Sequence, residues 1–175
     1  VAYISPVSFM PLEEVLQRVY ESGKDPLFMV LDRVTDVRNF GAICRTAECA
    51  GVDAIIVPAR GSARIGADAL KTSAGALMNI PVCRSMNLKD TLQMLKDSGI
   101  RIAGASEKAD KMMYDTDLSG PLCLIMGSEE TGISPEYLKK CDALIRIPMF
   151  GSTGSLNVSV AAGVITYEII RQRQP

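Results

Sequence analysis

Residues 147–161 read IPMFGSTGSLNVSVA, a stretch that runs from the end of a strand through a glycine loop into an apolar helix. Its two glycines allow backbone conformations that other residues avoid and let the chain approach a ligand closely. Ser155, Asn157 and Ser159 crowd the start of the helix, where free N–H groups and the positive end of the helix dipole gather. One of them is expected to cap the helix, and three are more than a cap requires. The stretch therefore predicts a ligand site at a helix N-terminus.

Strands and helices alternate along the rest of the chain. Short apolar runs, typical of strands buried on both faces, occupy residues 28–31, 54–58, 80–83, 101–105, 122–126 and 143–147. Helical patterns separate them, at residues 11–19, 42–50, 67–70, 88–98 and 156–171 and in a short helix from residue 134. The alternation predicts an α/β fold with a mostly parallel sheet and helices on both faces. The last helix is apolar almost all round, which indicates burial inside the fold or in a dimer interface.

Three loops that follow strands are rich in glycine and polar residues, at 32–41, 127–132 and 148–154. In open α/β sheets, ligands bind beyond the carboxyl ends of the strands. No G-x-G-x-x-G fingerprint and no G-x-x-x-x-G-K-[ST] phosphate loop occurs. The loops are therefore expected to hold a small ligand, but not in the common nucleotide-binding modes.

Composition excludes several kinds of chemistry. The chain has 175 residues, enough for one domain with a sizeable core, and no apolar run long enough to span a membrane. It has no histidine, which removes Ser-His and Cys-His nucleophiles and most zinc sites, so no metal is expected. The net charge of −1 predicts weak electrostatic attraction to nucleic acid, so an RNA partner requires a local basic patch or a further module.

The cysteines favour a reducing compartment. Their number is odd and no C-x-x-C pair occurs, a pattern typical of reduced thiols in a cytoplasmic protein; they are Cys44, Cys49, Cys83, Cys123 and Cys141. Residues 1–6 carry no basic region or signal peptide, and the first residue is not Met, so a fragment or a processed product is expected.

Three spaced motifs resemble those of the SpoU (TrmH) family of RNA ribose 2′-O-methyltransferases, in the family's order. They are Asn39-x-Gly41-x-x-x-Arg45, Gly127-x-Glu129-x-x-Gly132 and Ile147-Pro148-Met149-x-Gly151-x-x-x-Ser155-Leu156-Asn157-Val158-Ser159. The resemblance covers about residues 27–172. The sequence at residues 31–36 and 46–48 is most similar to that of the branch that methylates a guanosine of 23S rRNA.

The resemblance implies a SPOUT fold whose C-terminal segment forms a deep trefoil knot, and a homodimer that binds S-adenosylmethionine in that knot. It divides the chain into an N-terminal linker and helix (1–26) and a methyltransferase domain (27–175). Relatives in this branch often carry an N-terminal RNA-binding domain, which is expected to be absent from this chain.

The motif positions also imply site residues. The implied catalytic residues are Asn39, Arg45, Glu129, Ser155 and Asn157. The implied cofactor-binding residues are Ser73, Ala74, Gly75, Met126, Gly127, Ile147, Pro148, Met149, Leu156 and Asn157. Glu130 departs from the family, which often has Gly there, and an added carboxylate at the pocket mouth is expected to affect RNA approach.

By the resemblance, Arg45 stands at the position of the arginine proposed to activate the hydroxyl in this family. Deprotonating arginine at neutral pH spans about 5.5 pK units, roughly 7 kcal/mol. A cation that orients phosphate and hydroxyl is therefore preferred, with base action only in an unusual environment. Asn39 and Asn157 are expected to hold the ribose or Arg45, and Glu129 to pair with Arg45 or take a proton.

Each of these residues alone has a simpler interpretation: Asn39 as a helix cap, Arg45 as a solvated surface residue and Glu129 as a surface acid. Only their joint occurrence favours a site. For four other basic residues, a solvated surface and an RNA-facing patch are equally compatible with the sequence: Arg33, Arg60, Arg64 and Lys71.

Three hypotheses follow. The favoured one is an S-adenosylmethionine-dependent RNA ribose methyltransferase acting on rRNA, with tRNA as the alternative substrate. The second is a non-catalytic RNA-binding factor on the same fold, and the third is an α/β protein that binds another nucleotide. Cofactor binding separates the third from the others, and methyl incorporation into RNA separates the first from the second.

Overall fold

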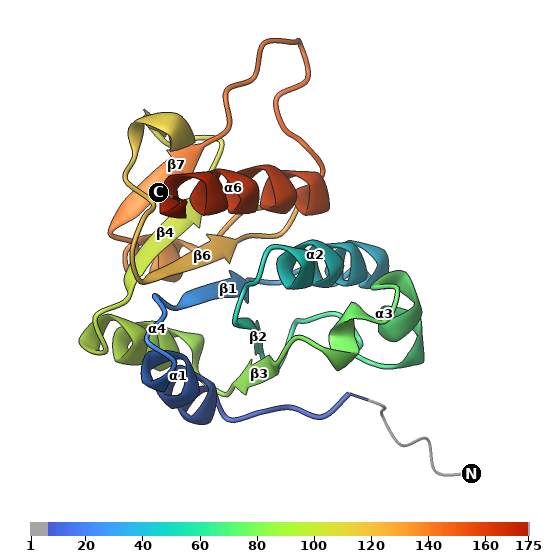
Figure 1. Cartoon of the computed structure of the whole chain (residues 1–175). Helices are drawn as coiled ribbons and strands as arrows, with labels where there is room; N and C mark the ends of the chain where they lie inside the picture. The colour runs from blue at the N-terminus through green and yellow to red at the C-terminus, as the bar shows by residue number, and fades with distance from the viewer. Residues whose placement is uncertain (1–6, 175) are drawn as a thin grey trace.

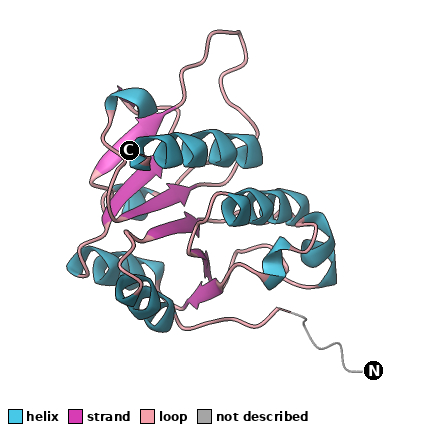
Figure 2. Cartoon of the chain, viewed as in Figure 1, coloured by secondary structure: helices cyan, strands magenta, loops and turns pink. Residues whose placement is uncertain are grey.

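A seven-stranded, wholly parallel sheet forms the centre of the protein (Figures 1 and 2), for which a computed structural model describes residues 7–174. The strand order is β3-β2-β1-β6-β4-β7-β5. The strands are β1 (Leu27–Leu31), β2 (Ala54–Pro58), β3 (Val82–Ser85), β4 (Arg101–Ala105), β5 (Lys111–Met112), β6 (Leu122–Met126) and β7 (Ala143–Arg146). The predicted α/β class with a parallel sheet is confirmed. Residues 1–6, read above for targeting signals and as part of the expected linker, lie outside the described residues.

Helices cover both faces of this sheet. They are α1 (Leu12–Glu21), α2 (Val37–Cys49), α3 (Ala67–Thr72), α4 (Leu88–Asp97), α5 (Pro135–Leu138) and α6 (Val158–Arg173), with 3₁₀ turns η1 (Ala76–Met78) and η2 (Met113–Asp115). In Figure 1, α2 and α6 lie side by side on one face, and α1 and α4 lie on the other. None of the helices within residues 7–174 has the length and apolar character needed to cross a membrane.

The two faces of β1 belong to two separate hydrophobic clusters. Phe28 and Val30 pack with the apolar sides of α1 and α4, whereas Met29 and Leu31 pack with those of α2 and α6. All five residues of β1 are buried. This two-sided burial is why the strand reads as a continuous apolar run rather than as an alternating one.

Two helix starts differ from the sequence prediction. We expected a loop through residue 41, but α2 begins at Val37, because the Asp36 carboxylate accepts hydrogen bonds from the backbone N–H groups of Arg38 and Asn39. The final helix begins at Val158 rather than at residue 156, with Asn157 as its cap. Strand β5 was not predicted, since a strand of two residues carries no readable periodicity.

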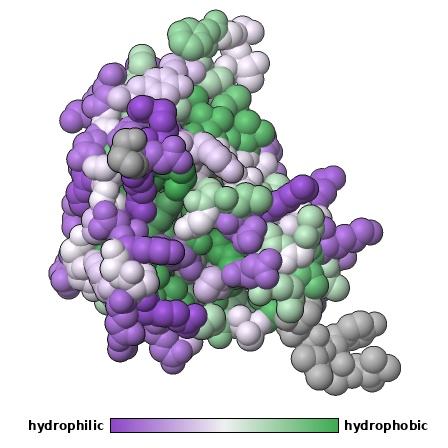
Figure 3. Space-filling view, in the orientation of Figure 1, coloured by the Kyte–Doolittle hydropathy of each residue, from purple (hydrophilic) through white to green (hydrophobic). Residues whose placement is uncertain are grey.

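Helix α6 is not buried on all sides within the chain. Its inner side contains Ala162, Ile165 and Ile169, which are almost inaccessible to solvent, but Val160 and Tyr167 are 50% and 52% exposed. Burial of the whole helix inside the fold, one of the two predicted explanations, is therefore wrong. Figure 3 shows hydrophobic surface over α6 and the loop that precedes it.

Four of the five cysteines are sheltered, which leads to a testable prediction about thiol labelling. Burial raises the pKa of Cys83 to about 11 and that of Cys141 to about 12, and it also raises the pKa of the Cys44 and Cys123 thiols. Only Cys49, at the end of α2, is exposed. Because the thiolate is the reactive form, one thiol should react quickly with a chromogenic disulfide at pH 8, and five should react after denaturation. Rapid reaction of two or more thiols in the folded protein would contradict the burial of this core.

Candidate methyltransferase site

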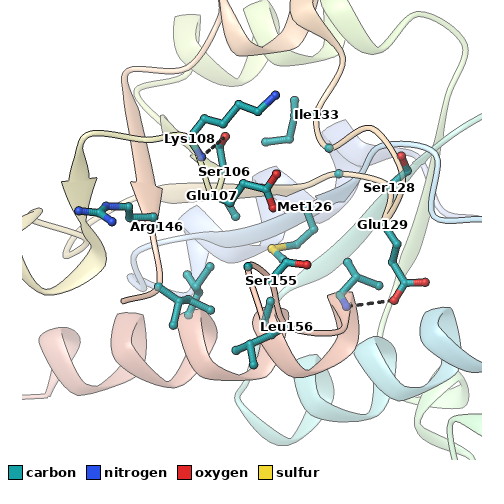
Figure 4. A pocket seen from close by; sticks show the side chains of 18 of the residues that line it. Ser106, Glu107, Lys108, Met126, Ser128, Glu129, Ile133, Arg146, Ser155 and Leu156 are labelled. Atoms are coloured by element: carbon teal, nitrogen blue, oxygen red, sulfur yellow. Dashed lines mark hydrogen bonds between the residues drawn. The ribbon is translucent and has the colours of Figure 1, made fainter. Parts of the chain in front are cut away.

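A pocket of about 410 Å³ lies at the carboxyl edge of β4, β6 and β7, beside the N-terminus of α6 (Figure 4). The loops after these strands form its walls, and α6 forms its floor. The lining residues are 105–108, 126–133, 145–147 and 154–158, together with Leu138, Met149, Ala161 and Ile165. The site predicted at the strand ends and a helix N-terminus therefore coincides with a real cavity.

Three residues from the three sequence motifs meet at the edge of this pocket. The Asn39 amide Nδ2 donates to Glu129 Oε2 at 3.1 Å. The Asn157 amide Nδ2 lies 2.7 Å from Glu129 Oε1 and 3.0 Å from Asn39 Oδ1, and it donates to both. The backbone N–H of Val158 also points to Glu129 Oε1, at 3.4 Å (Figure 4). We call these three side chains the Asn–Glu–Asn cluster.

Helix capping explains why both asparagines are available. Asp36 caps α2, so the side chain of Asn39 on the first turn is free to reach Glu129. Asn157 caps α6 through its Oδ1, which accepts from the backbone N–H groups of Ser159 and Val160. Its Nδ2 donates to Glu129 and Asn39 within the cluster. An amide side chain carries both an acceptor and a donor, so one residue performs both tasks.

Glu129 is held by a tight loop that only glycine permits. A Cβ on Gly127 would lie 2.1 Å from the carbonyl carbon of Gly132 and 2.2 Å from the backbone nitrogen of Ile133. Gly132 has a φ of +67°, a left-handed conformation. The backbones of Ser128 and Gly132 exchange two hydrogen bonds, of 2.9 and 3.2 Å. Loop 127–134 is thus a closed turn with Glu129 near its tip.

Gly41, the glycine of the first motif, allows α2 to pack closely against the end of α3. A Cβ on Gly41 would lie 2.0 Å from Thr72 Oγ1 and 2.8 Å from the backbone nitrogen of Ser73. The close approach of α2 to the end of α3 thus depends on this glycine.

Most predicted cofactor residues line the pocket, as does the implied catalytic residue Ser155. They are Met126, Gly127, Ile147, Met149, Leu156 and Asn157. Pro148 is not among the lining residues, and neither are Ser73, Ala74 and Gly75. The Ser73 hydroxyl donates to the Leu70 carbonyl and accepts from the N–H of Leu77. That turn shapes the fold beside Gly41, and its assignment to the cofactor stays a prediction.

One wall of the pocket is formed by residues that were not predicted from the sequence. Residues 105–108 follow β4 directly, and Arg146 closes β7; both contribute to the lining. These residues carry no motif, but the position after a buried strand was a usable signal, because all parallel strands end at the same edge. Glu130, the departure from the family pattern, is exposed and also lines the pocket.

Arg45 does not join the cluster. It is exposed on α2, and no hydrogen bond or ion pair links its side chain to another residue within 7–174. The expected pairing of Glu129 with Arg45 is not formed, because both carboxylate oxygens of Glu129 accept from the two asparagines instead. Arg33 contacts loop 127–134, whereas Arg60, Arg64 and Lys71 are exposed.

The arrangement suits proton transfer and positioning. The Glu129 carboxylate is oriented by two amide donors and one backbone donor, beside a pocket with apolar walls and a helix N-terminus. An oriented carboxylate is able to accept a proton from a hydroxyl placed next to it. No group of His, Cys, Asp and Glu residues suitable for a metal ion occurs in the described part of the chain.

Comparisons with known proteins show what this chain is similar to. The sequence profile of the SpoU rRNA methylase family matches residues 26–167. The chain is 47% identical over 164 residues to the 23S rRNA (guanosine-2′-O-)-methyltransferase RlmB of Pseudomonas aeruginosa, covering 94% of this chain and 65% of that protein. It is 43% identical to RlmB of Escherichia coli, covering 92% of this chain and 66% of that protein.

Solved structures show the same fold. The SpoU methyltransferase AviRb of Streptomyces viridochromogenes, in complex with the cofactor AdoMet, superposes with a TM-score of 0.78 at 32% identity, covering 85% of this chain and 58% of that one. An AdoMet-bound rRNA methyltransferase of Sinorhizobium meliloti gives a TM-score of 0.82 at 28% identity, covering 94% and 61%. The chain thus spans 65–66% of the length of the two RlmB proteins and 58–61% of these two structures. The profile match and the RlmB relatives together show that this chain belongs to the SpoU rRNA methylase family.

Proposed function

We propose that this chain transfers a methyl group from S-adenosylmethionine to the ribose 2′-hydroxyl of an RNA nucleotide, a guanosine of 23S rRNA, in the cytoplasm. The observation that carries the proposal is the Asn–Glu–Asn cluster at the edge of a pocket, assembled from all three family motifs. The identity to the RlmB proteins supports the rRNA substrate and the guanosine.

The pocket fits S-adenosylmethionine in size and chemistry. Its volume of about 410 Å³ falls in the range of small-molecule sites. Met126, Ile147 and Leu156 line the pocket with apolar side chains, and Ser128, Ser155 and Asn157 line it with polar ones. When bound, the cofactor supplies a methyl group on a sulfonium, ready for in-line displacement by an oxygen nucleophile.

The residues of this chain would then position the hydroxyl and receive its proton. Asn39 and Asn157 hold Glu129 in one orientation, so that its carboxylate accepts the proton of the 2′-hydroxyl as the oxygen attacks. Arg45, exposed and charged, suits the RNA phosphate next to the reacting nucleotide. Retaining its proton avoids the cost of roughly 7 kcal/mol for deprotonation at neutral pH.

A homodimer is part of this proposal. Helix α6, which lines the pocket through Ala161, also carries three exposed apolar side chains: Val160, Val164 and Tyr167. A second copy of the chain packed on this side of α6 would cover them. It would also let Arg45 serve either its own pocket or the partner's, a question that sedimentation and mixed-mutant complementation would answer.

The deep trefoil knot is proposed on the family resemblance. Two features support it. One is the long connection from β7 to α6, prominent in Figure 1. The other is that α6 packs on α2, the helix that follows β1, although β6 and β4 separate β1 from β7 in the sheet.

Calorimetry with S-adenosylmethionine followed by methyl-transfer assays tests the function. We expect saturable binding at micromolar to sub-millimolar concentrations, and incorporation of labelled methyl groups into unmodified 23S rRNA in preference to tRNA. Preference for tRNA would favour the alternative substrate. Binding without methyl transfer to either RNA would favour the non-catalytic factor, and a folded protein that binds no cofactor at millimolar concentration would overturn the proposal.

A further inference from the structure

Loop 127–134 is attached to the end of β1 at both of its ends. Where the chain enters the loop, the backbone N–H of Asp32 donates to the Met126 carbonyl at 2.8 Å. Where the chain leaves it, the Ser134 N–H donates to Asp32 Oδ2 at 2.6 Å. Asp32 is 2% exposed. One buried residue therefore sets the distance between the two ends of the loop that carries Glu129.

Arg33 holds the returning half of the same loop. Its guanidinium donates to the Gly132 carbonyl at 3.1 Å, and its Nε lies 3.3 Å from Asp32 Oδ1. Gly132 is also the residue whose backbone pairs with Ser128, on either side of Glu129. The cation thus contacts the turn at the point that closes it.

The backbone of Arg33 adopts an unfavourable conformation. Its φ is +58°, a left-handed value that glycine adopts readily and that arginine rarely does. An arginine at this position therefore raises the conformational energy of the fold, which a glycine would not do. The side chain must contribute something that compensates for this strain, and its contacts are with Asp32 and Gly132.

We propose that Arg33, held by Asp32, is a positioning residue that keeps loop 127–134 in the geometry in which Glu129 meets Asn39 and Asn157. Through the loop, Arg33 sets the affinity of the pocket for S-adenosylmethionine, since residues 126–133 line that pocket. This inference rests on the proposed function for the identity of the ligand, but the clamp itself concerns only this chain.

The decisive variant is Arg33→Gly, because it removes the side chain and relieves the strain. We expect a melting temperature equal to or above that of the wild type, with affinity for S-adenosylmethionine weakened about tenfold, as for loss of one charge-assisted hydrogen bond. The KM for the cofactor should rise by a similar factor, and kcat at saturating cofactor should also fall, because Glu129 is no longer held against Asn39 and Asn157. Unchanged affinity and unchanged KM in a folded Arg33→Gly protein would overturn the proposal.

A matched control is available at the opposite edge of the sheet. Arg101 also donates to backbone carbonyls of a loop, those of Asp117 and Ser119, but it begins β4 at the end remote from the pocket. Arg101→Ala should leave cofactor affinity unchanged. If it weakens binding as much as Arg33→Gly does, the effect is general loosening and the proposal fails.

Amide hydrogen exchange tests the clamp without any ligand. In Arg33→Gly, the amides of Ser128 and Gly132 should exchange about tenfold faster or more, while those of β1 and β6 keep their protection. Unchanged exchange at both amides would overturn the clamp. Faster exchange in a protein whose wild type binds no S-adenosylmethionine would support the clamp and instead reject the proposed cofactor.

Discussion

Asn157→Ser should abolish most methyl transfer while leaving the protein as stable as the wild type. Serine is about as good a helix cap as asparagine, so the start of α6 stays satisfied. It lacks the Nδ2 donor that lies 2.7 Å from Glu129 Oε1 and 3.0 Å from Asn39 Oδ1. With one of its orienting donors gone, the carboxylate is no longer confined to one position, and kcat/KM should fall about 100-fold or more.

Asn157→Ala separates the two tasks of the residue. It removes both the cap and the donor, so the free energy of unfolding should drop by about 1 kcal/mol, while activity should fall as far as in Asn157→Ser. Urea denaturation and single-turnover methylation of 23S rRNA measure the two effects on the same samples. An Asn157→Ser protein with wild-type activity would contradict the assignment of the Asn–Glu–Asn cluster to catalysis.

Gly127→Ala should have the largest effect on stability and should remove cofactor binding as well. The added Cβ would lie 2.1 Å from the carbonyl carbon of Gly132 and 2.2 Å from the backbone nitrogen of Ile133. Backbone atoms cannot move aside by a change of side-chain rotamer. Relief requires opening the turn and breaking its hydrogen bonds with Ser128. We expect a loss of about 3 kcal/mol or more, at the upper end of overpacking effects.

Gly151→Ala is the matched control for this prediction. A Cβ on Gly151 meets no atom within 4 Å, so the unfolding free energy should change by no more than about 0.5 kcal/mol. Urea midpoints and cofactor titrations of both variants test the contrast. A Gly127→Ala protein with the wild-type midpoint would show that loop 127–134 adapts easily, and the steric account of the second motif would be wrong.

Local sequence was enough to predict the fold class and most of the elements. Residues 28–31 and 122–126 are apolar throughout, and such runs form strands covered on both sides. The helix predicted at residues 88–98 forms as α4, and Asn87 caps it through the backbone N–H groups of Lys89 and Asp90, which are its neighbours in the chain. The start of α2 was misplaced, because Asp36 and Asn39 are both plausible caps and only the geometry distinguishes them.

By itself, the sequence determined the α/β class, the placement of a site at the strand ends, and the family, since each of these depends on periodicity or on motifs contiguous in the chain. Only the tertiary structure decided that Asn39, Glu129 and Asn157 meet, that Arg45 stands apart from them, and that Arg33 clamps loop 127–134. Asn39 contacts Glu129 and Asn157, and Arg33 contacts Gly132, across about a hundred positions of the chain. Such contacts follow from strand order, which places β6 beside β1, and sequence patterns carry no information about which distant strands become neighbours.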